Sequence, residues 1–141
     1  ALRVIFEQGA KLVADDRVLL TRQGSRLIAA APGEAAKVGL TGALEARGLG
    51  ILGLPAARRR ARAPVVLAVA LVPPDEVERL PGDWQGAAAI EKTEGLEQLG
   101  VVLPLLRLAP FEVSAALKLR LALHNVQLAG KGRSGSIKRL A

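Results

Sequence analysis

A chain of 141 residues is the size of one domain, and because it has no cysteine and a single histidine, His124, disulfides, thiolate catalysis and histidine-rich metal sites are excluded. The formal net charge of +7 favours an anionic partner, while an aromatic content of 2% argues against nucleic-acid binding through base stacking. The apolar runs are too short to span a bilayer and the N-terminus lacks the layout of a signal peptide, which predicts a cytoplasmic protein that is not bound to a membrane.

The N-terminal residues predict the end of a helix and then a short strand. Apolar residues between positions 2 and 6 precede Gly9, a residue that commonly stops helices. Residues 12–14 form an apolar run, which we expect to be a strand with Asp15 and Asp16 at its end. An aspartate there either faces a ligand site or forms a turn with the neighbouring backbone, and the dipeptide alone does not separate these alternatives.

A hairpin and a glycine-rich segment follow. Residues 18–21 and 26–31 flank a glycine-containing turn at 23–25, which predicts two antiparallel strands. Residues 39–54 contain five glycines, too many for a regular helix, so we expect backbone conformations that other residues resist.

The second half of the chain alternates between strand and helix patterns. Residues 65–72 form a continuous aliphatic run, typical of a strand covered on both faces. Residues 75–80 predict a short helix, residues 101–108 a strand interrupted by Pro104, and residues 112–123 a longer helix. This interleaving favours a compact α/β or α+β domain with a mixed sheet.

One constellation of charged residues lies in the glycine-rich segment, at residues 45–52. Glu45 and Arg47 come directly before Gly48 and Gly50, so a carboxylate and a guanidinium adjoin backbone that a ligand could approach closely. Carboxylates suit Mg²⁺, which prefers oxygen ligands. The alternative is a Glu–Arg ion pair beside an ordinary turn, and the spacing leaves the two open.

A second constellation is basic. Arg58, Arg59, Arg60 and Arg62 form a cluster, which is either a solvated loop or a surface that contacts phosphate or an acidic protein.

A third lies near the C-terminus, where residues 132–139 share the first glycine, Gly132, and the lysine, Lys138, of the phosphate-binding pattern G-x-x-x-x-G-K-[ST]. Ile137 and Arg139 replace its last glycine and its hydroxyl residue, so a flexible basic tail is the alternative.

The order of these segments resembles the catalytic domain of HPr kinase/phosphorylases, in the short form typical of alphaproteobacteria. The likeness rests on residues 9–18, 31–32 and 45–52, the last being the signature stretch of that family, and it covers about residues 1–123. It implies a single P-loop-type α/β domain similar to the nucleotide domain of phosphoenolpyruvate carboxykinase, with a mixed sheet and flanking helices.

The resemblance also implies an activity, the phosphorylation of a serine on HPr with ATP and Mg²⁺, possible phosphorolytic reversal, and a homo-oligomer. Asp15 would be the general base for the serine hydroxyl and, in the reverse direction, the acid. Asp16 would support the catalytic site and the metal, and Glu45 would help to hold Mg²⁺. The other residues implied in the site are the signature loop with Arg47, Gly48 and Gly50, and the arginines near phosphate or HPr, Arg58, Arg59 and Arg60.

Residues 124–141 stand apart in this reading as a basic, glycine-containing segment. If the C-terminus is read directly into the N-terminus, residues 132–141 followed by residues 1–5 align with the P-loop and the next helix of the family. The chain therefore resembles a circular permutation, with a phosphate-binding loop formed by Gly132, Gly135, Ser136 and Lys138.

Two alternatives to an active kinase stay open. The altered phosphate loop fits a catalytically impaired relative that keeps the fold without productive nucleotide binding. The net charge fits a basic binding module for an anionic partner such as nucleic acid.

Overall fold

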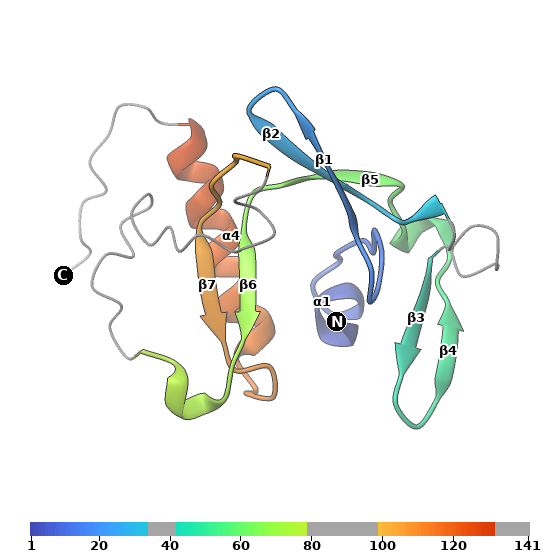
Figure 1. The fold of residues 1–141 in the computed structure, drawn as a ribbon. Coiled ribbons are helices and arrows are strands. Elements are labelled where there is room, and N and C mark those ends of the chain that lie inside the picture. The colour runs from blue at the N-terminus through green and yellow to red at the C-terminus, as the bar shows by residue number, and fades with distance from the viewer. Residues whose placement is uncertain (34–41, 79–98, 132–141) are drawn as a thin grey trace. The chain divides into compact units, whose positions relative to one another are not determined.

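The computed structural model describes residues 1–33, 42–78 and 99–131 (Figure 1). These residues form a mixed α/β fold of short strands and few helices, as the sequence predicts, but the described strands form three separate sheets and not the one mixed sheet that was expected. The chain divides into two compact units, Ala1–Val65 and Val66–Ala141. Among the described residues, no helix is long and apolar enough to cross a membrane.

The first unit opens with helix α1, Leu2–Phe6. The helix ends as predicted, because Gly9 has a left-handed φ of 71° that side chains with a Cβ rarely adopt. The N–H of Ala10 then donates to the carbonyl of Val4 at 3.1 Å, which satisfies one of the carbonyl groups that a helix end leaves unpaired.

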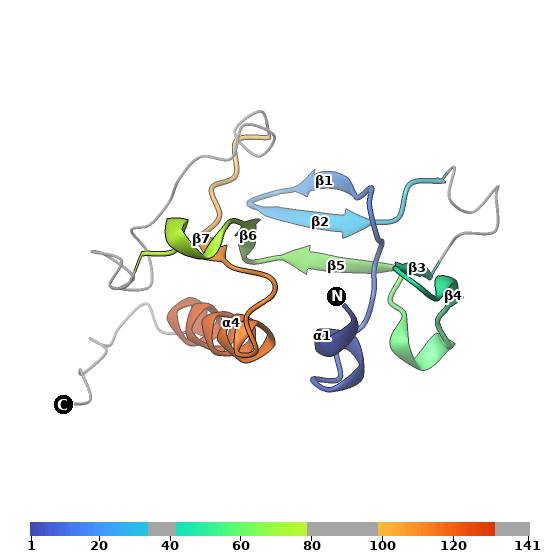
Figure 2. The ribbon, with the colours of Figure 1, turned by 90° about the horizontal axis from the view of Figure 1, so that it is seen from below.

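A three-stranded antiparallel sheet follows, in the order β1–β2–β5, with β1 at Leu19–Gln23, β2 at Arg26–Ala30 and β5 at Arg62–Val65 (Figure 2). The predicted hairpin is confirmed, with a two-residue turn at Gly24 and Ser25. Gly24 has a positive φ of 61° and Ser25 has a negative φ. A type II′ turn requires this combination at its two central residues.

The glycine-rich segment forms a second hairpin, with β3 at Ala43–Ala46 and β4 at Gly50–Gly53. This agrees with the prediction that the segment is not helical. A 3₁₀ turn, η1 at Ala56–Arg58, leads from the hairpin toward β5.

The core of this unit joins the helix to the second hairpin. Ile5 of α1, Leu44 of β3 and Leu54 form one buried cluster, and Leu12 packs against it. Each such side chain contributes about 1.5–3 kcal/mol when it leaves water. Because the cluster draws on four segments, it fixes the backbone on which the charged residues lie.

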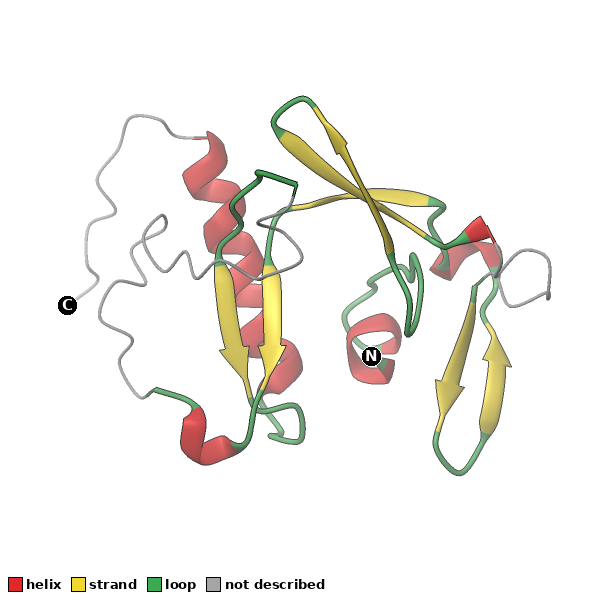
Figure 3. Cartoon of the chain, in the orientation of Figure 1, coloured by secondary structure: helices red, strands yellow, loops and turns green. Residues whose placement is uncertain are grey.

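The second unit contains a parallel strand pair, β6 at Ala68–Leu71 and β7 at Leu105–Leu108, and helix α4 at Ala115–Lys131, which lies beside β7 (Figure 3). Pro104 directly precedes β7. The proline predicted to interrupt a strand at residues 101–108 therefore marks the point after which the strand begins. A single 3₁₀ turn, η2 at Pro74–Glu76, replaces the short helix predicted at residues 75–80.

The predicted continuous strand at residues 65–72 is wrong. Val65 pairs with Leu27 of β2, whereas Ala68 pairs with Leu105 of β7, so the apolar run contributes to two different sheets. An aliphatic run predicts burial but not which strand it pairs with.

The predicted C-terminal helix is confirmed, with shifted bounds. It starts at Ala115, not at residue 112, and continues without a break through Leu123 and His124 to Lys131. The prediction of a separate segment from residue 124 onward stays a prediction, since residues 132–141 lie outside the described part of the chain.

Candidate functional site

The candidate site lies in the first unit, where three segments with charged side chains meet. They are the loop at residues 12–17, the β3–β4 hairpin, and Arg58, Arg59 and Arg60, which we call the arginine segment. Hydrogen bonds that cross large distances in the sequence hold the three together.

The carboxylate of Asp15 is bound to the outer edge of β3. Its Oδ2 accepts a hydrogen bond of 2.9 Å from the backbone N–H of Glu45. The N–H of Leu54 donates to the carbonyl of Gly42, and because pairs alternate along antiparallel strands, Glu45 and its partner Ile51 form a pair without hydrogen bonds. The N–H of Glu45 therefore points away from β4, and Asp15 provides its acceptor.

The side chain of Glu45 occupies the exposed face of the hairpin. Its neighbours in β3, Leu44 and Ala46, are buried, and successive strand residues face opposite sides. The exposed carboxylate of Glu45 thus lies on the strand whose backbone binds Asp15. The sequence-based expectation that these two residues lie together is met, while their catalytic and metal-binding roles stay predictions.

Asp15 and Asp16 do not lie at the end of a strand, which corrects the prediction. Of residues 12–14, only Leu12 pairs, in a single parallel bridge to Arg59. The chain then bends, and both aspartates are exposed. A bridge of one residue is enough here because the hydrogen bond from Glu45, not strand pairing, holds Asp15.

The turn between β3 and β4 explains two signature glycines. The N–H of Leu49 donates to the carbonyl of Ala46 at 2.9 Å, and Gly48 has a φ of 85°, the arrangement of a type II turn. Gly50 follows with a φ of 88°. These left-handed conformations are sufficient reason for glycine at both positions.

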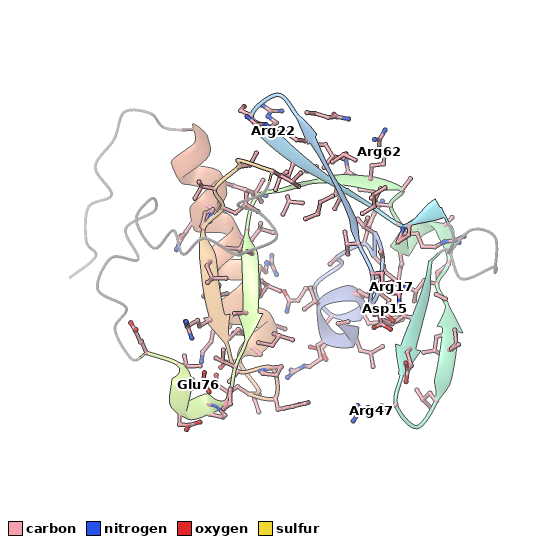
Figure 4. The ribbon with its side chains drawn as sticks, viewed as in Figure 1. Asp15, Arg17, Arg22, Arg47, Arg62 and Glu76 are labelled. Carbon is pink, nitrogen blue, oxygen red and sulfur yellow. The ribbon has the colours of Figure 1, made fainter. Side chains whose placement is uncertain are left out.

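Arg47 is exposed at the end of this hairpin (Figure 4). No ion pair joins it to Glu45, although both residues are described, so the simple ion-pair alternative for this segment does not hold.

The arginine segment is fixed beside the loop that contains Asp15. The N–H of Leu12 donates to the carbonyl of Arg58 at 2.9 Å, and the N–H of Arg60 donates to the carbonyl of Leu12 at 2.8 Å. Since Leu12 lies three residues before Asp15, the segment is held close to the candidate base.

Two supporting residues were not foreseen from the sequence. Gly42 is buried with a φ of 76°, and a Cβ placed on it would lie 1.9 Å from Cδ of Arg59. Phe6 stacks under the guanidinium of Arg58, with Cζ 4.7 Å from the ring centroid. Gly42 was visible only as one glycine of five, and Phe6 only as a rare aromatic residue.

Asp16 and Glu45 are the carboxylates predicted to hold Mg²⁺. The described residues hold no cluster of three or more histidine, cysteine, aspartate or glutamate side chains, so they form no cage made of protein ligands alone. Mg²⁺ is commonly bound by one or two carboxylates together with water and substrate phosphates. Asp16 and Glu45, both exposed, could supply those carboxylates.

The predicted phosphate-binding residues Gly132, Gly135, Ser136 and Lys138 lie outside the described residues. The P-loop-type character of the fold and its likeness to the nucleotide domain of phosphoenolpyruvate carboxykinase therefore stay predictions.

Comparison of the fold with solved structures supports the resemblance seen in the sequence. The structure of the Hpr(Ser) kinase/phosphatase from Coxiella burnetii superposes with a TM-score of 0.68 and 24% sequence identity, covering 93% of this chain and 80% of that chain. No protein-family model matches the sequence, and no curated protein matches it either. At this identity the likeness shows a common fold.

Proposed function

We propose that this chain is a protein-serine kinase of the HPr kinase type, which transfers phosphate from ATP to a serine of HPr in a Mg²⁺-dependent reaction. The observation that carries the proposal is the hydrogen bond from the N–H of Glu45 to the carboxylate of Asp15. It fixes the exposed carboxylate of Asp15 to the strand that carries Glu45, in a chain whose fold is similar to that of an Hpr(Ser) kinase/phosphatase.

Asp15 would act as the general base. Phosphoryl transfer mainly requires positioning and charge neutralisation, with one carboxylate to accept the proton of the attacking hydroxyl. Because Oδ2 of Asp15 is bound to the N–H of Glu45, Oδ1 would be the oxygen that accepts this proton. In the forward direction Oδ1 receives the serine proton, and in the reverse direction the protonated Asp15 returns it.

Glu45 and Asp16 would hold the metal, and the arginine segment would face the phosphates. Bound Mg-ATP supplies the transferred phosphoryl group and the charge that neutralises its oxygens. Arg47, Gly48 and Gly50 would shape the loop next to Glu45, while Gly132, Gly135, Ser136 and Lys138 would bind phosphate. A homo-oligomer and a cytoplasmic location complete the proposal.

The direct test is transfer of labelled phosphate from ATP to HPr. We expect activity in the parent chain and a loss of about 100-fold or more in Asp15→Asn, the scale of general-base catalysis. The matched control is Asp75→Asn, which removes an exposed carboxylate from η2 in the second unit and is expected to keep full activity. Full activity of Asp15→Asn would contradict the assigned base.

Calorimetry separates the proposal from its alternatives. Binding of ATP that depends on Mg²⁺ supports the kinase. Absence of binding in a folded chain would instead identify a catalytically impaired relative, in agreement with the altered residues Ile137 and Arg139. Binding to nucleic acid that weakens steeply with salt, without transfer to HPr, would identify a basic binding module.

A further inference from the structure

The side chain of Arg58 is already engaged within the first unit. Its Nη1 donates a hydrogen bond to the carbonyl of Ile5, and its guanidinium lies over the ring of Phe6 at 4.7 Å. Both partners belong to the last turn of α1, where carbonyl groups lack helical partners and a positive charge is favourable. Arg58 therefore joins α1 to the arginine segment, 53 residues away in the sequence.

The backbone around Arg58 transmits this anchor to the site. The carbonyl of Arg58 and the N–H of Arg60 both bond to Leu12, whose side chain packs on the buried cluster. A displacement of Arg58 would therefore alter both hydrogen bonds of Leu12. Through Leu12 it would also move the loop that contains Asp15.

The other two arginines are in different surroundings. The side chain of Arg59 crosses the surface of Gly42, at a distance that excludes any side chain there. Arg60 is exposed, and no hydrogen bond or ion pair of its side chain is found in the described part of the chain.

We infer that the arginine segment is divided by role: Arg58 is a positioning residue that fixes the segment to α1, and Arg60 is the arginine that meets the anionic phosphate. A guanidinium that is bound to a helix end and stacked on an aromatic ring would have to give up those contacts to reach a ligand, whereas an exposed guanidinium on a fixed backbone can offer its bidentate fork directly. This inference rests on the proposed function, because it assigns the anionic ligand to the same site.

Phe6 provides the decisive variant, because a phenyl ring cannot bind phosphate. Phe6→Leu and Arg58→Lys both weaken the contact of residue 58 with α1. Of the two, Arg58→Lys changes the segment itself but keeps its positive charge. We expect both to speed amide hydrogen exchange at Leu12 and Arg60, measured by NMR, by roughly two- to fivefold, which corresponds to the loss of one cation–π contact. We also expect kcat for HPr phosphorylation to fall by a similar factor, and the double variant to be no slower than Arg58→Lys alone.

Arg60→Gln is the complementary variant, with inorganic tripolyphosphate as the probe. It is expected to leave amide exchange unchanged and to weaken tripolyphosphate binding by roughly tenfold, the effect of losing one charge-assisted contact. Arg58→Lys is expected to change that binding less than Arg60→Gln does.

The assignment is overturned if Arg58→Lys or Arg58→Gln weakens tripolyphosphate binding at unchanged amide exchange, or if Phe6→Leu leaves exchange at Leu12 and Arg60 as in the parent. It is also overturned if Arg60→Gln binds tripolyphosphate as the parent does. The amide-exchange and tripolyphosphate-binding measurements do not require catalysis. A parent chain that transfers no phosphate to HPr would therefore refute the proposed function, while these two measurements would still decide the roles of the arginines.

Discussion

Oδ2 of Asp15 lies 2.9 Å from the backbone nitrogen of Glu45. This hydrogen bond joins a side chain in a bend to the edge of a strand 30 residues further along the chain. The amide that Asp15 binds points away from β4, and no main-chain acceptor in the hairpin competes for it. The position of Asp15 therefore depends on the hairpin. Its side chain has two separate functions, because it accepts this structural hydrogen bond and is also the proposed base.

Two substitutions of Asp15 are expected to separate those properties. Asp15→Asn keeps an oxygen that accepts the N–H of Glu45, so the free energy of unfolding is expected to stay close to that of the parent. Asp15→Ala removes the acceptor and is expected to cost about 1 kcal/mol. Both are expected to lose phosphate transfer. Urea unfolding measures the difference in stability between the two variants. Equal free energies of unfolding would mean that the hydrogen bond contributes nothing to stability.

Gly42→Ala is expected to destabilise the first unit more than Gly48→Ala. Both glycines have positive φ, which costs an alanine about 1–2 kcal/mol. Only at Gly42 would the new methyl group also collide with Arg59, because no atom lies within 4 Å at Gly48. Urea unfolding of both variants checks the order. In an Arg59→Ala background the two costs are expected to become similar, and a difference that persists there would exclude Arg59 as the cause.

Leu44→Ala is expected to cost about 2–5 kcal/mol of stability, as the removal of a buried leucine from a packed cluster does. Leu44 is 1% exposed and belongs to the cluster that holds α1 against β3. The control is Ile51→Ala in the same hairpin, where the side chain is 65% exposed and the expected change is within about 0.5 kcal/mol. Comparable losses in the two variants would show that the hairpin buries a different face.

Glu45→Gln is expected to raise the Mg²⁺ concentration needed for half-maximal phosphate transfer by roughly tenfold, equivalent to losing about 1.4 kcal/mol of metal binding. The substitution keeps the backbone N–H that binds Asp15, so stability is expected to be unchanged. Glu78→Gln, an exposed glutamate of the second unit, serves as the control. An unchanged Mg²⁺ requirement in Glu45→Gln would remove Glu45 from the metal site.

Local signals in the sequence predicted the local structure well. Gly9 marked the end of α1, the glycine-containing turn at residues 23–25 marked a hairpin, and the glycines before Leu54 excluded a helix. Each depends on backbone conformations that a few neighbouring residues determine.

Features that depend on distant partners were not predicted from the same patterns. The apolar run at residues 65–72 looks continuous, yet Val65 pairs with Leu27 and Ala68 pairs with Leu105, in two different sheets. The anchor of Arg58 requires Phe6 and Ile5 to be brought beside it by the core, which no spacing within the arginine cluster indicates. The proximity of Asp15 and Glu45 came from family resemblance, because nothing in the intervening residues specifies it.

Binding of Asp15 to β3 has a consequence for aggregation as well as for chemistry. The outer edge of a short strand is a template on which another chain can add a strand, and natural proteins block such edges by occupying their amides and by placing charges beside them. Asp15 does both at Glu45. Asp15→Ala is therefore expected to aggregate more readily at high concentration. Its soluble yield would fall even when no substrate is present.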